Sequence, residues 1–250
     1  MTFEFIDQQL ANQHQQTRFR QLDCVTEQKD GYISVAGEKY LNFSSNDYLG
    51  LNHHPKINLA MQEGIDKFGV CASASSLVTG YQYAHQSLEN DICTWLNKPR
   101  CVLYSSGFAA NLGVLQALGQ ENTAFWLDKL SHASLIDGAL ASKAKVKRFL
   151  HNDMQQLAGF LAKEVIKTET SKPSVSNLII SEGVFSMDGD QAKIADLLVL
   201  ANKHQAWLYV DDAHSIGVIG KEGEGSLSHV DHNNNIDIMK KGVDSYVYQP

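Results

Sequence analysis

Four polar residues follow two apolar segments in the C-terminal third of the sequence, and their types could do chemistry. Glu182 and Ser186 follow the first apolar segment, and Asp211 and His214 follow the second. In a parallel sheet, ligands bind at the carboxyl ends of the strands. Many buried strands end in polar loop residues without any function, but four such residues at two neighbouring strand ends favour a ligand or cofactor site.

The same residues allow more than one chemistry. Asp211 could hold a positive charge on a ligand nitrogen while His214 donates or accepts a hydrogen bond beside it. Carboxylate and imidazole also bind metals, but no second cluster supplies the missing ligands, so a metal site ranks low. Ser186, His214 and Asp211 could form a hydrolase triad, although the sequence lacks the G-x-S-x-G turn that exposes such a serine.

Two further positions could contribute to a site. The segment 105–108, Ser-Ser-Gly-Phe, lies between an expected strand and an expected helix. The N–H groups at a helix start bind phosphate, and small residues let the anion approach, but such a segment is more often a simple cap and turn. His132 follows another expected strand and could stack on a flat ring or relay a proton, although a lone histidine is more often structural.

The glycines at 217, 220, 223 and 225 resemble a dinucleotide-binding loop only superficially. They follow Asp-Asp-Ala-His instead of opening a helix directly after a strand, so the spacing lacks the required context. We expect them to form a flexible loop.

The elements that must position these residues alternate between strand and helix patterns. This alternation predicts an α/β fold with a mostly parallel sheet and helices on both faces. An amphipathic arm is expected over 2–22, two short strands around a turn over 31–37, and a small-residue loop over 73–80. We expect strands at 101–104, 124–127, 146–150, 178–180 and 208–210, and helices near 55–68, 85–97, 108–115, from 133, from 153 and around 194–198.

The composition excludes some classes of partner. A net charge of −7 disfavours nucleic acid, whose phosphates need clustered Lys and Arg. The sequence contains no apolar run long enough to span a membrane and no signal-peptide pattern at its start, which favours a cytoplasmic protein. The four cysteines have no C-x-x-C spacing, so reduced thiols are expected.

Several motifs together resemble a known family, the pyridoxal-phosphate-dependent α-oxoamine synthases, and lean toward its biotin-biosynthesis branch. The resemblance covers residues 18–239 and implies the large domain of the fold-type I PLP-dependent transferases. The motifs are Asn42-Phe-Ser-Ser-Asn-Asp-Tyr-Leu-Gly-Leu, Ser105-Ser-Gly-Phe-Ala-Ala-Asn, Leu130-Ser-His-Ala-Ser-Leu, Glu182-Gly-Val-Phe-Ser-Met-Asp-Gly-Asp and Val210-Asp-Asp-Ala-His with Gly217-Val-Ile-Gly.

The resemblance implies a cofactor, pyridoxal 5'-phosphate (PLP), and roles for the matching residues. Gly107 and Phe108 would hold its phosphate, and His132 would stack on its ring and contact substrate. Asp211 would pair with the ring nitrogen. His214 and Ser186 would contact the side of the ring that carries the phenolic oxygen. His132, Asp211 and His214 would be the catalytic residues, and Arg20 and Asn46 would bind the substrate carboxylate.

The implied reaction is a decarboxylating condensation of L-alanine with a pimeloyl thioester, carried on CoA or on acyl carrier protein. The family resemblance also implies a homodimer. Two alternatives stay open: another α-oxoamine synthase, such as a glycine C-acetyltransferase-like enzyme, or a non-catalytic truncated remnant. A metal-dependent hydrolase is a distant third.

The sequence departs from the family pattern in two places. Residues 71–80 contain fewer glycines than the family loop and lack its basic residue near Ser76. Lys240 and Lys241 lie before the expected position of the Thr-x-x-Lys lysine that forms the Schiff base, and neither has that spacing. We therefore expect an arm and substrate-contact segment over 1–50, a partial PLP-binding domain over 51–239, a divergent tail over 240–250 without a C-terminal small domain, and no turnover by these 250 residues alone.

Overall fold

The computed structural model describes residues 3–170, 175–228 and 245–246. The chain divides into two compact units, Met1–Tyr48 and Leu49–Pro250. Within the described residues, no helix combines the length and the apolar character needed to cross a membrane.

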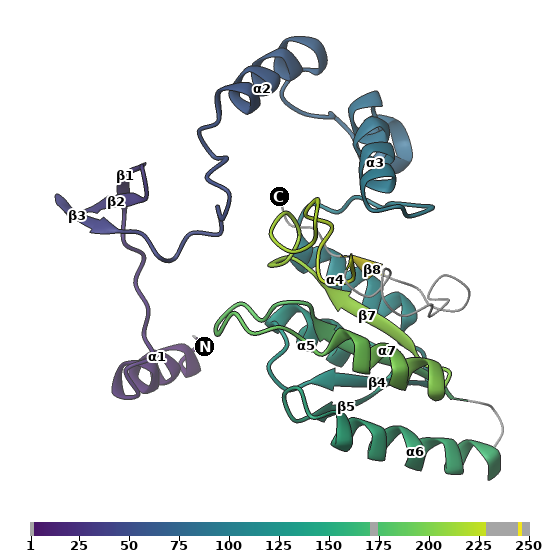
Figure 1. The fold of residues 1–250 in the computed structure, drawn as a ribbon. Coiled ribbons are helices and arrows are strands. Elements are labelled where there is room, and N and C mark those ends of the chain that lie inside the picture. The colour runs from purple at the N-terminus through teal and green to yellow at the C-terminus, as the bar shows by residue number, and fades with distance from the viewer. Residues whose placement is uncertain (1–2, 171–174, 229–244, 247–250) are drawn as a thin grey trace. The chain divides into compact units, whose positions relative to one another are not determined.

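The first unit holds one helix and a small antiparallel sheet of order β1-β2-β3 (Figure 1). Asp30 and Gly31 connect β1 to β2 with φ angles of 51° and 78°, as a two-residue hairpin turn requires. The expected pair of strands is therefore extended to three, and no side chain of the helix is buried. The elements are α1 (Phe5–Gln15), β1 (Val25–Lys29), β2 (Tyr32–Val35) and β3 (Glu38–Leu41).

The second unit begins with helices that precede its sheet. The side chain of His54 caps the first of them by accepting from the Lys56 N–H, and Gly69 ends it with a φ of 80°, as expected. Neither α-helix in this segment has a fully buried side chain, although both carry apolar residues at helical spacing. The elements are α2 (Pro55–Phe68), the π-helix η1 (Ser76–Gly80) and α3 (Tyr83–Trp95).

Two local predictions were wrong in this segment. Part of the expected loop over 73–80 forms η1, and a glycine at 80 permits it, since a Cβ there would collide with the carbonyl oxygen of Ala74. Residues 101–104 form no strand. Their β-branched and aromatic residues find no neighbouring strand among the described residues, and 72% of Val102 is exposed. Strand preference depends on such a neighbour.

The main sheet has the predicted architecture, with parallel strands in the order β5-β4-β6-β7-β8. One helix precedes β4 and three follow β4, β5 and β6, and together they cover both faces of the sheet (Figure 1). The strands are β4 (Thr123–Asp128), β5 (Lys145–Phe149), β6 (Ser176–Glu182), β7 (Trp207–Asp211) and β8 (Ser245–Tyr246). The helices are α4 (Gly107–Leu118), α5 (Ala133–Leu140), α6 (Met154–Thr170) and α7 (Ile194–Lys203).

Alternation along β4 explains how one strand supports both layers. Phe125 and Leu127 pack in the core beneath α4 and α5, whereas Ala124 and Trp126 pack in the core beneath α6 and α7. Full burial of a side chain such as Leu or Phe contributes about 1.5–3 kcal/mol. Because the strands are parallel, their carboxyl ends meet at one edge of the sheet, where β4, β6 and β7 end in Asp128, Glu182 and Asp211.

A buried carboxylate fastens the loop that follows β7. Asp212 is fully buried and accepts hydrogen bonds from the Ser215 hydroxyl and from the N–H and hydroxyl of Ser226, the latter two at 2.8 and 2.5 Å. Burial raises the pKa of Asp212, and these hydrogen bonds oppose that rise. Gly183 and Gly225 approach this carboxylate so closely that a Cβ on either would collide with it.

Gly183→Ala should therefore destabilise the protein by about 1–3 kcal/mol, because the new methyl group meets side-chain oxygens of Asp212, Ser226 and Ser215. Gly159→Ala is the matched control, since a Cβ at this exposed position of α6 meets nothing within 4 Å. It should stabilise the helix by about 0.5–1 kcal/mol. Urea unfolding of both variants measures the difference, and equal stability of the two would contradict the packing described here.

Candidate functional site

The carboxyl edge of the main sheet brings two buried acidic side chains together. Glu182 ends β6 and Asp211 ends β7, and the two residues are partners in the strand register. Their exposed fractions are only 3% and 7%. Neighbouring buried carboxylates disfavour each other's charge, so the surrounding donors decide which of them ionises more easily.

Asp211 is held in place by two N–H donors. The side-chain amide of Asn111 donates to its Oδ2 at 2.7 Å, and the backbone N–H of Ala213 donates to its Oδ1 at 3.1 Å. The Tyr209 hydroxyl donates to Oδ1 of Asn111 at 2.6 Å, which fixes the orientation of the amide. Burial raises the pKa of Tyr209, so its hydroxyl keeps the proton that it donates.

The Asn111 amide extends this network to His132. Its Nδ2 also donates to the hydroxyl oxygen of Ser134 at 2.8 Å, and that oxygen lies 2.7 Å from Nδ1 of His132. Because Nδ1 also accepts the Ser134 N–H at 3.2 Å, the neutral imidazole carries its proton on Nε2. His132 is the N-cap of α5 and is itself exposed. The network therefore fixes one edge of an imidazole that solvent or a ligand can reach.

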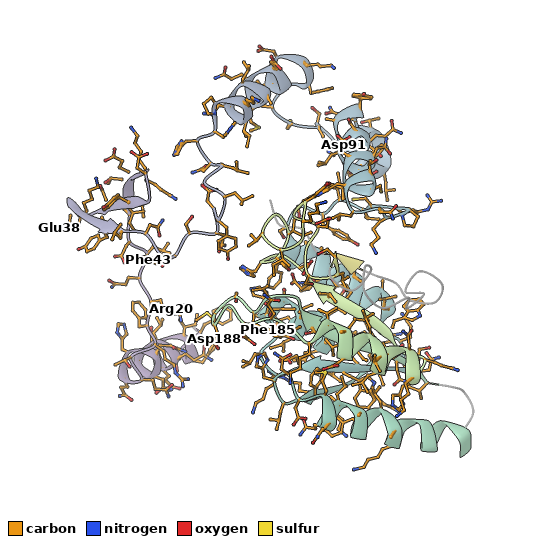
Figure 2. The ribbon with its side chains drawn as sticks, viewed as in Figure 1. Arg20, Glu38, Phe43, Asp91, Phe185 and Asp188 are labelled. Atoms are coloured by element: carbon orange, nitrogen blue, oxygen red, sulfur yellow. The ribbon has the colours of Figure 1, made fainter. Side chains whose placement is uncertain are left out.

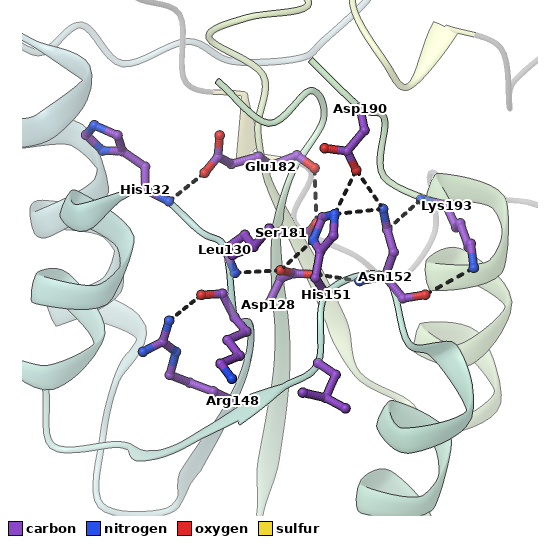
Figure 3. A network of polar contacts seen from close by, with 12 residues as sticks. Asp128, Leu130, His132, Arg148, His151, Asn152, Ser181, Glu182, Asp190 and Lys193 are labelled. Atoms are coloured by element: carbon purple, nitrogen blue, oxygen red, sulfur yellow. Dashed lines mark hydrogen bonds and ion pairs between the residues drawn. The ribbon is translucent and has the colours of Figure 1, made fainter. Parts of the chain in front are cut away.

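The carboxylate of Glu182 joins the segments that follow β4 and β6 (Figure 3). Its Oε1 accepts the backbone N–H of His132 at 2.5 Å, and the carboxylate also accepts the backbone N–H of Ser186. Burial, followed by the negative charge of Asp211, raises the pKa of Glu182 to about 7, and the two N–H donors oppose that rise. The carboxyl group of Glu182 thus exchanges its proton near neutral pH.

The start of α4 lies on the same network. Ser106 caps this helix by accepting the Ala109 N–H at 3.1 Å. Gly107 is the first helical residue, and both it and Asn111, one turn later, are buried. Residues four apart lie on the same face of a helix, so Gly107 lies on the face of α4 from which Asn111 contacts Asp211. Phe108 is 42% exposed.

The remaining predicted site residues lie in different parts of the chain. Ser186 is exposed on the loop after β6, and the half-buried His214 lies in the turn after β7, so both belong to this edge. Arg20 and Asn46 are exposed residues of the Met1–Tyr48 unit, where the Tyr48 hydroxyl contacts Oδ1 of Asn46 at 3.5 Å. Lys240 and Lys241 lie outside the described residues, whereas the predicted tail over 240–250 includes β8 (Ser245–Tyr246).

Sequence reasoning missed the side chains that support the predicted ones. Asn111, Ser134 and Tyr209 were given no role, and Glu182 was grouped with the strand ends without one. The available signal was the position of Asn111, four residues after Gly107 and at the end of a recognised motif. Which side chain it would meet could not be read from the sequence, because its partners lie 23, 98 and 100 residues away.

The other chemistries suggested by the sequence gain no support from the arrangement. Among the described residues, no group of three or more His, Cys, Asp and Glu side chains could hold a metal ion. The glycines at 217, 220, 223 and 225 lie outside any helix and all have positive φ angles, which confirms the predicted loop.

Comparison with known proteins identifies relatives of this chain. The profile of a family described as "Aminotransferase class I and II" matches residues 38–243. The protein named 8-amino-7-oxononanoate synthase from Salmonella paratyphi B is 44% identical over 222 residues, which are 88% of this chain and 55% of that protein. The chain thus spans about half the length of the curated relatives it matches.

Solved structures give the same result. Serine palmitoyltransferase from S. paucimobilis, solved with a bound PLP–myriocin aldimine, is 26% identical with a TM-score of 0.79, over 90% of this chain and 56% of that one. The 8-amino-7-oxononanoate synthase of Francisella tularensis is 31% identical with a TM-score of 0.59, over 74% and 49%. These matches confirm the predicted fold class and the resemblance found in the sequence.

The raised pKa of Glu182 predicts a pH dependence of stability. The folded protein binds this proton more tightly than the unfolded chain, whose carboxyl has a pKa near 4.5, so stability should fall as pH rises from about 4.5 through about 7. The loss amounts to roughly 3 kcal/mol at most. Glu182→Gln keeps an oxygen acceptor but cannot titrate, and should show a smaller loss between pH 5 and pH 8.

Urea unfolding at the two pH values measures this difference. Glu121→Gln, at an exposed position after α4, is the matched control and should keep the wild-type pH dependence. Identical pH dependence in Glu182→Gln and wild type would show that Glu182 does not titrate in this range.

Proposed function

Because the chain belongs to the class I and II aminotransferase family, we propose that the carboxyl edge of its sheet binds pyridoxal 5'-phosphate. The observation that carries this proposal is the buried carboxylate of Asp211, held by Asn111 and by the Ala213 N–H. A buried carboxylate fixed by donors is suited to a protonated ring nitrogen, because a charge-assisted hydrogen bond is stronger than a neutral one.

Other residues at this edge of the sheet suit the remaining parts of the cofactor. Gly107 and Phe108 begin α4, where the N–H groups of the first turn have no partner within the helix and attract a phosphate. The exposed ring of His132 is held along one edge, which leaves its flat face for stacking. Ser186 and His214 supply polar groups for the phenolic oxygen from the loops after β6 and β7.

When bound, PLP supplies an electron sink for a carbanion beside the nitrogen of an amino acid. Asp211 would keep the proton on the ring nitrogen, which that sink requires. Asn111 and Tyr209 would keep the carboxylate from rotating away. Glu182 would hold the backbone of His132 and of Ser186 at a fixed separation, so that groups on either side of the ring stay in register.

The reaction that we propose for the whole protein is the decarboxylating condensation of L-alanine with a pimeloyl thioester, on CoA or acyl carrier protein. The support is the 44% identity to a protein named 8-amino-7-oxononanoate synthase, against 26% to a serine palmitoyltransferase. Arg20 and Asn46 would bind substrate carboxylate, a task suited to a planar guanidinium. A cytoplasmic location is proposed on the same grounds, from the named biosynthetic relatives.

We also propose that the whole protein is a homodimer, with a second copy as the partner of α2 and α3. These helices carry apolar side chains at helical spacing, yet none of them is fully buried: Met61 is 66% exposed, Ile65 46% and Leu88 48%. Exposed apolar surface of this kind marks a protein interface. Sedimentation equilibrium gives the mass that tests the dimer.

Asp211→Asn should weaken PLP binding by about 10- to 100-fold, because the charged acceptor for the ring nitrogen is replaced by a neutral amide. Equilibrium dialysis of the chain against PLP measures the affinity directly. Asp196→Asn, at an exposed position in the first turn of α7, is the matched control and should bind as the wild type does. Unchanged affinity in Asp211→Asn would remove Asp211 from the site.

The same substitution tests the proposed reaction in a biotin-requiring strain. A polypeptide that continues these residues through a Thr-x-x-Lys segment should support growth without biotin, and its Asp211→Asn variant should not. Growth with neither polypeptide, while both bind PLP as predicted, would reject the proposed substrates and leave the cofactor site intact.

A further inference from the structure

His151 lies between two carboxylates, one on each side of its ring (Figure 3). Its Nδ1 is 3.0 Å from Oδ1 of Asp128 at the end of β4, and its Nε2 is 2.7 Å from Oδ2 of Asp190. Asp190 belongs to the loop between β6 and α7. The imidazole therefore connects this loop to the ends of β4 and β5.

The two carboxylates favour a proton on each ring nitrogen. A neutral imidazole has one N–H and one lone pair, and its lone pair would face a carboxylate oxygen that can only accept. Asp128 is 1% exposed and also accepts the backbone N–H groups of Leu130 at 2.8 Å and Asn152 at 3.0 Å, so its ionised form is the one that is fully satisfied. His151 is thus held as an imidazolium that donates in both directions.

The loop held by this imidazolium is a compact turn that carries Ser186. The Phe185 N–H donates to the carbonyl of Asp190 and the Gly189 N–H to that of Phe185, both at 2.9 Å. The buried ring of Phe185 also lies edge-on to His151, with centroids 4.4 Å apart, whereas Asp188 on the same loop is exposed (Figure 2). Both sides of the turn therefore rest on one histidine.

We propose that His151 is a positioning residue, which in its protonated form fixes the loop 184–191, and with it Ser186, against the sheet and releases the loop when it loses its proton. The role assigned to Ser186 rests on the proposed PLP site. The holding of the loop does not, because its contacts are all made by residues of the chain itself.

Few other contacts anchor the carboxylate of Asp190. Its Oδ1 is buried and has no hydrogen-bond partner among the described residues, and its Oδ2 receives only the Asn152 amide, at 3.2 Å, besides His151. A charged hydrogen bond contributes about 1.5–3 kcal/mol, and a neutral one about half as much. The loss of the imidazolium proton should therefore change the local stability of the loop measurably.

The other charged groups around the ring are directed elsewhere. Lys193, before α7, donates to the carbonyl oxygen of Asn152 at 3.1 Å, and Arg148 of β5 donates to the carbonyl oxygen of Lys129. The carboxylate of Asp153, before α6, accepts a backbone N–H at 2.9 Å. Asp128 and Asp190 are thus the groups that set the charge state of His151. The titratable and charged residues of the surrounding elements are Asp128, Lys129, Arg148, Asp153, Glu182, Asp188, Asp190 and Lys193.

The direction of the pH effect follows from these contacts. Burial alone lowers the pKa of His151, but the hydrogen bonds and charges of Asp128 and Asp190 outweigh it, so the pKa lies above its ordinary value of 6.5. The stabilisation is then fully present below about pH 6.5 and is lost as pH rises through the raised pKa of the folded protein.

Hydrogen exchange of the backbone amides at 184–191, followed from pH 6 to pH 9 and corrected for the intrinsic rates, tests this proposal on the cofactor-free chain. Exchange in this loop should accelerate about tenfold as His151 loses its proton, with the titration of His151 read from its ring nitrogen shifts by NMR. A neutral His151 at pH 6, or a loop whose exchange does not depend on pH, would overturn the proposal.

Two variants separate positioning from simple loss of structure. In Asp190→Asn the amide can donate to Nε2 of a neutral imidazole, so the loop should stay protected when His151 loses its proton. In His151→Ala the loop should exchange rapidly at every pH, and PLP affinity should fall. His204→Ala, at the C-cap of α7, is the control and should leave both unchanged.

These measurements also separate the proposal from the assignment of the cofactor site. A pH-dependent loop together with unchanged PLP affinity in His151→Ala would remove Ser186 from the binding site and overturn the positioning role. Unchanged PLP binding in Asp211→Asn would instead reject the cofactor site. That result would say nothing against the pH dependence of the loop, which is measured without PLP.

Discussion

The hydrogen bond from the Asn111 amide to the Asp211 carboxylate is the contact on which the site depends. It joins the start of α4 to the end of β7, and the same nitrogen reaches Ser134 at the start of α5. The Tyr209 hydroxyl fixes which end of the amide faces the carboxylate. Since all four side chains are buried, an unmade bond here would cost the full desolvation of a polar group, about 1–3 kcal/mol.

The carboxyl edge of the sheet concentrates negative charge, and the fold manages that charge in three ways. Asp211 accepts hydrogen bonds from a side-chain amide and a backbone N–H, burial raises the pKa of Glu182 to about 7, and Asp128 lies 3.0 Å from the imidazole of His151. Asp212 lies deeper and is satisfied by serine hydroxyl and backbone donors. Each carboxylate thus has a different partner type, which allows four acidic groups at neighbouring strand ends.

Much of the fold could be predicted because its signals are local. The apolar run that becomes β6, the proline and glycine that bound α2, and the serine that caps α4 each act within a few residues. Residues 101–104 show the limit of that reasoning. They have the composition of a strand, but a strand forms only where a partner strand is available, and composition does not show that.

The candidate site was predictable to the level of its strand ends and motifs. Asp211, His132 and Gly107 could be predicted as site residues because parallel strands and helix starts place ligand-binding groups at known points. Asn111, Tyr209 and His151 could not, because their roles come from partners between 23 and 100 residues away. Nothing in the spacing of an asparagine and a tyrosine nearly a hundred residues apart predicts a shared hydrogen bond.

The ¹⁵N chemical shift of the ring nitrogen of labelled PLP, measured with the protein at neutral pH, tests the central claim most directly. If the Asp211 carboxylate, held by Asn111, faces that nitrogen, the shift should be that of a protonated pyridinium and should stay so as pH rises to 8. A shift that follows the titration of free PLP would show that the carboxylate does not contact the cofactor, and would contradict the account of the site.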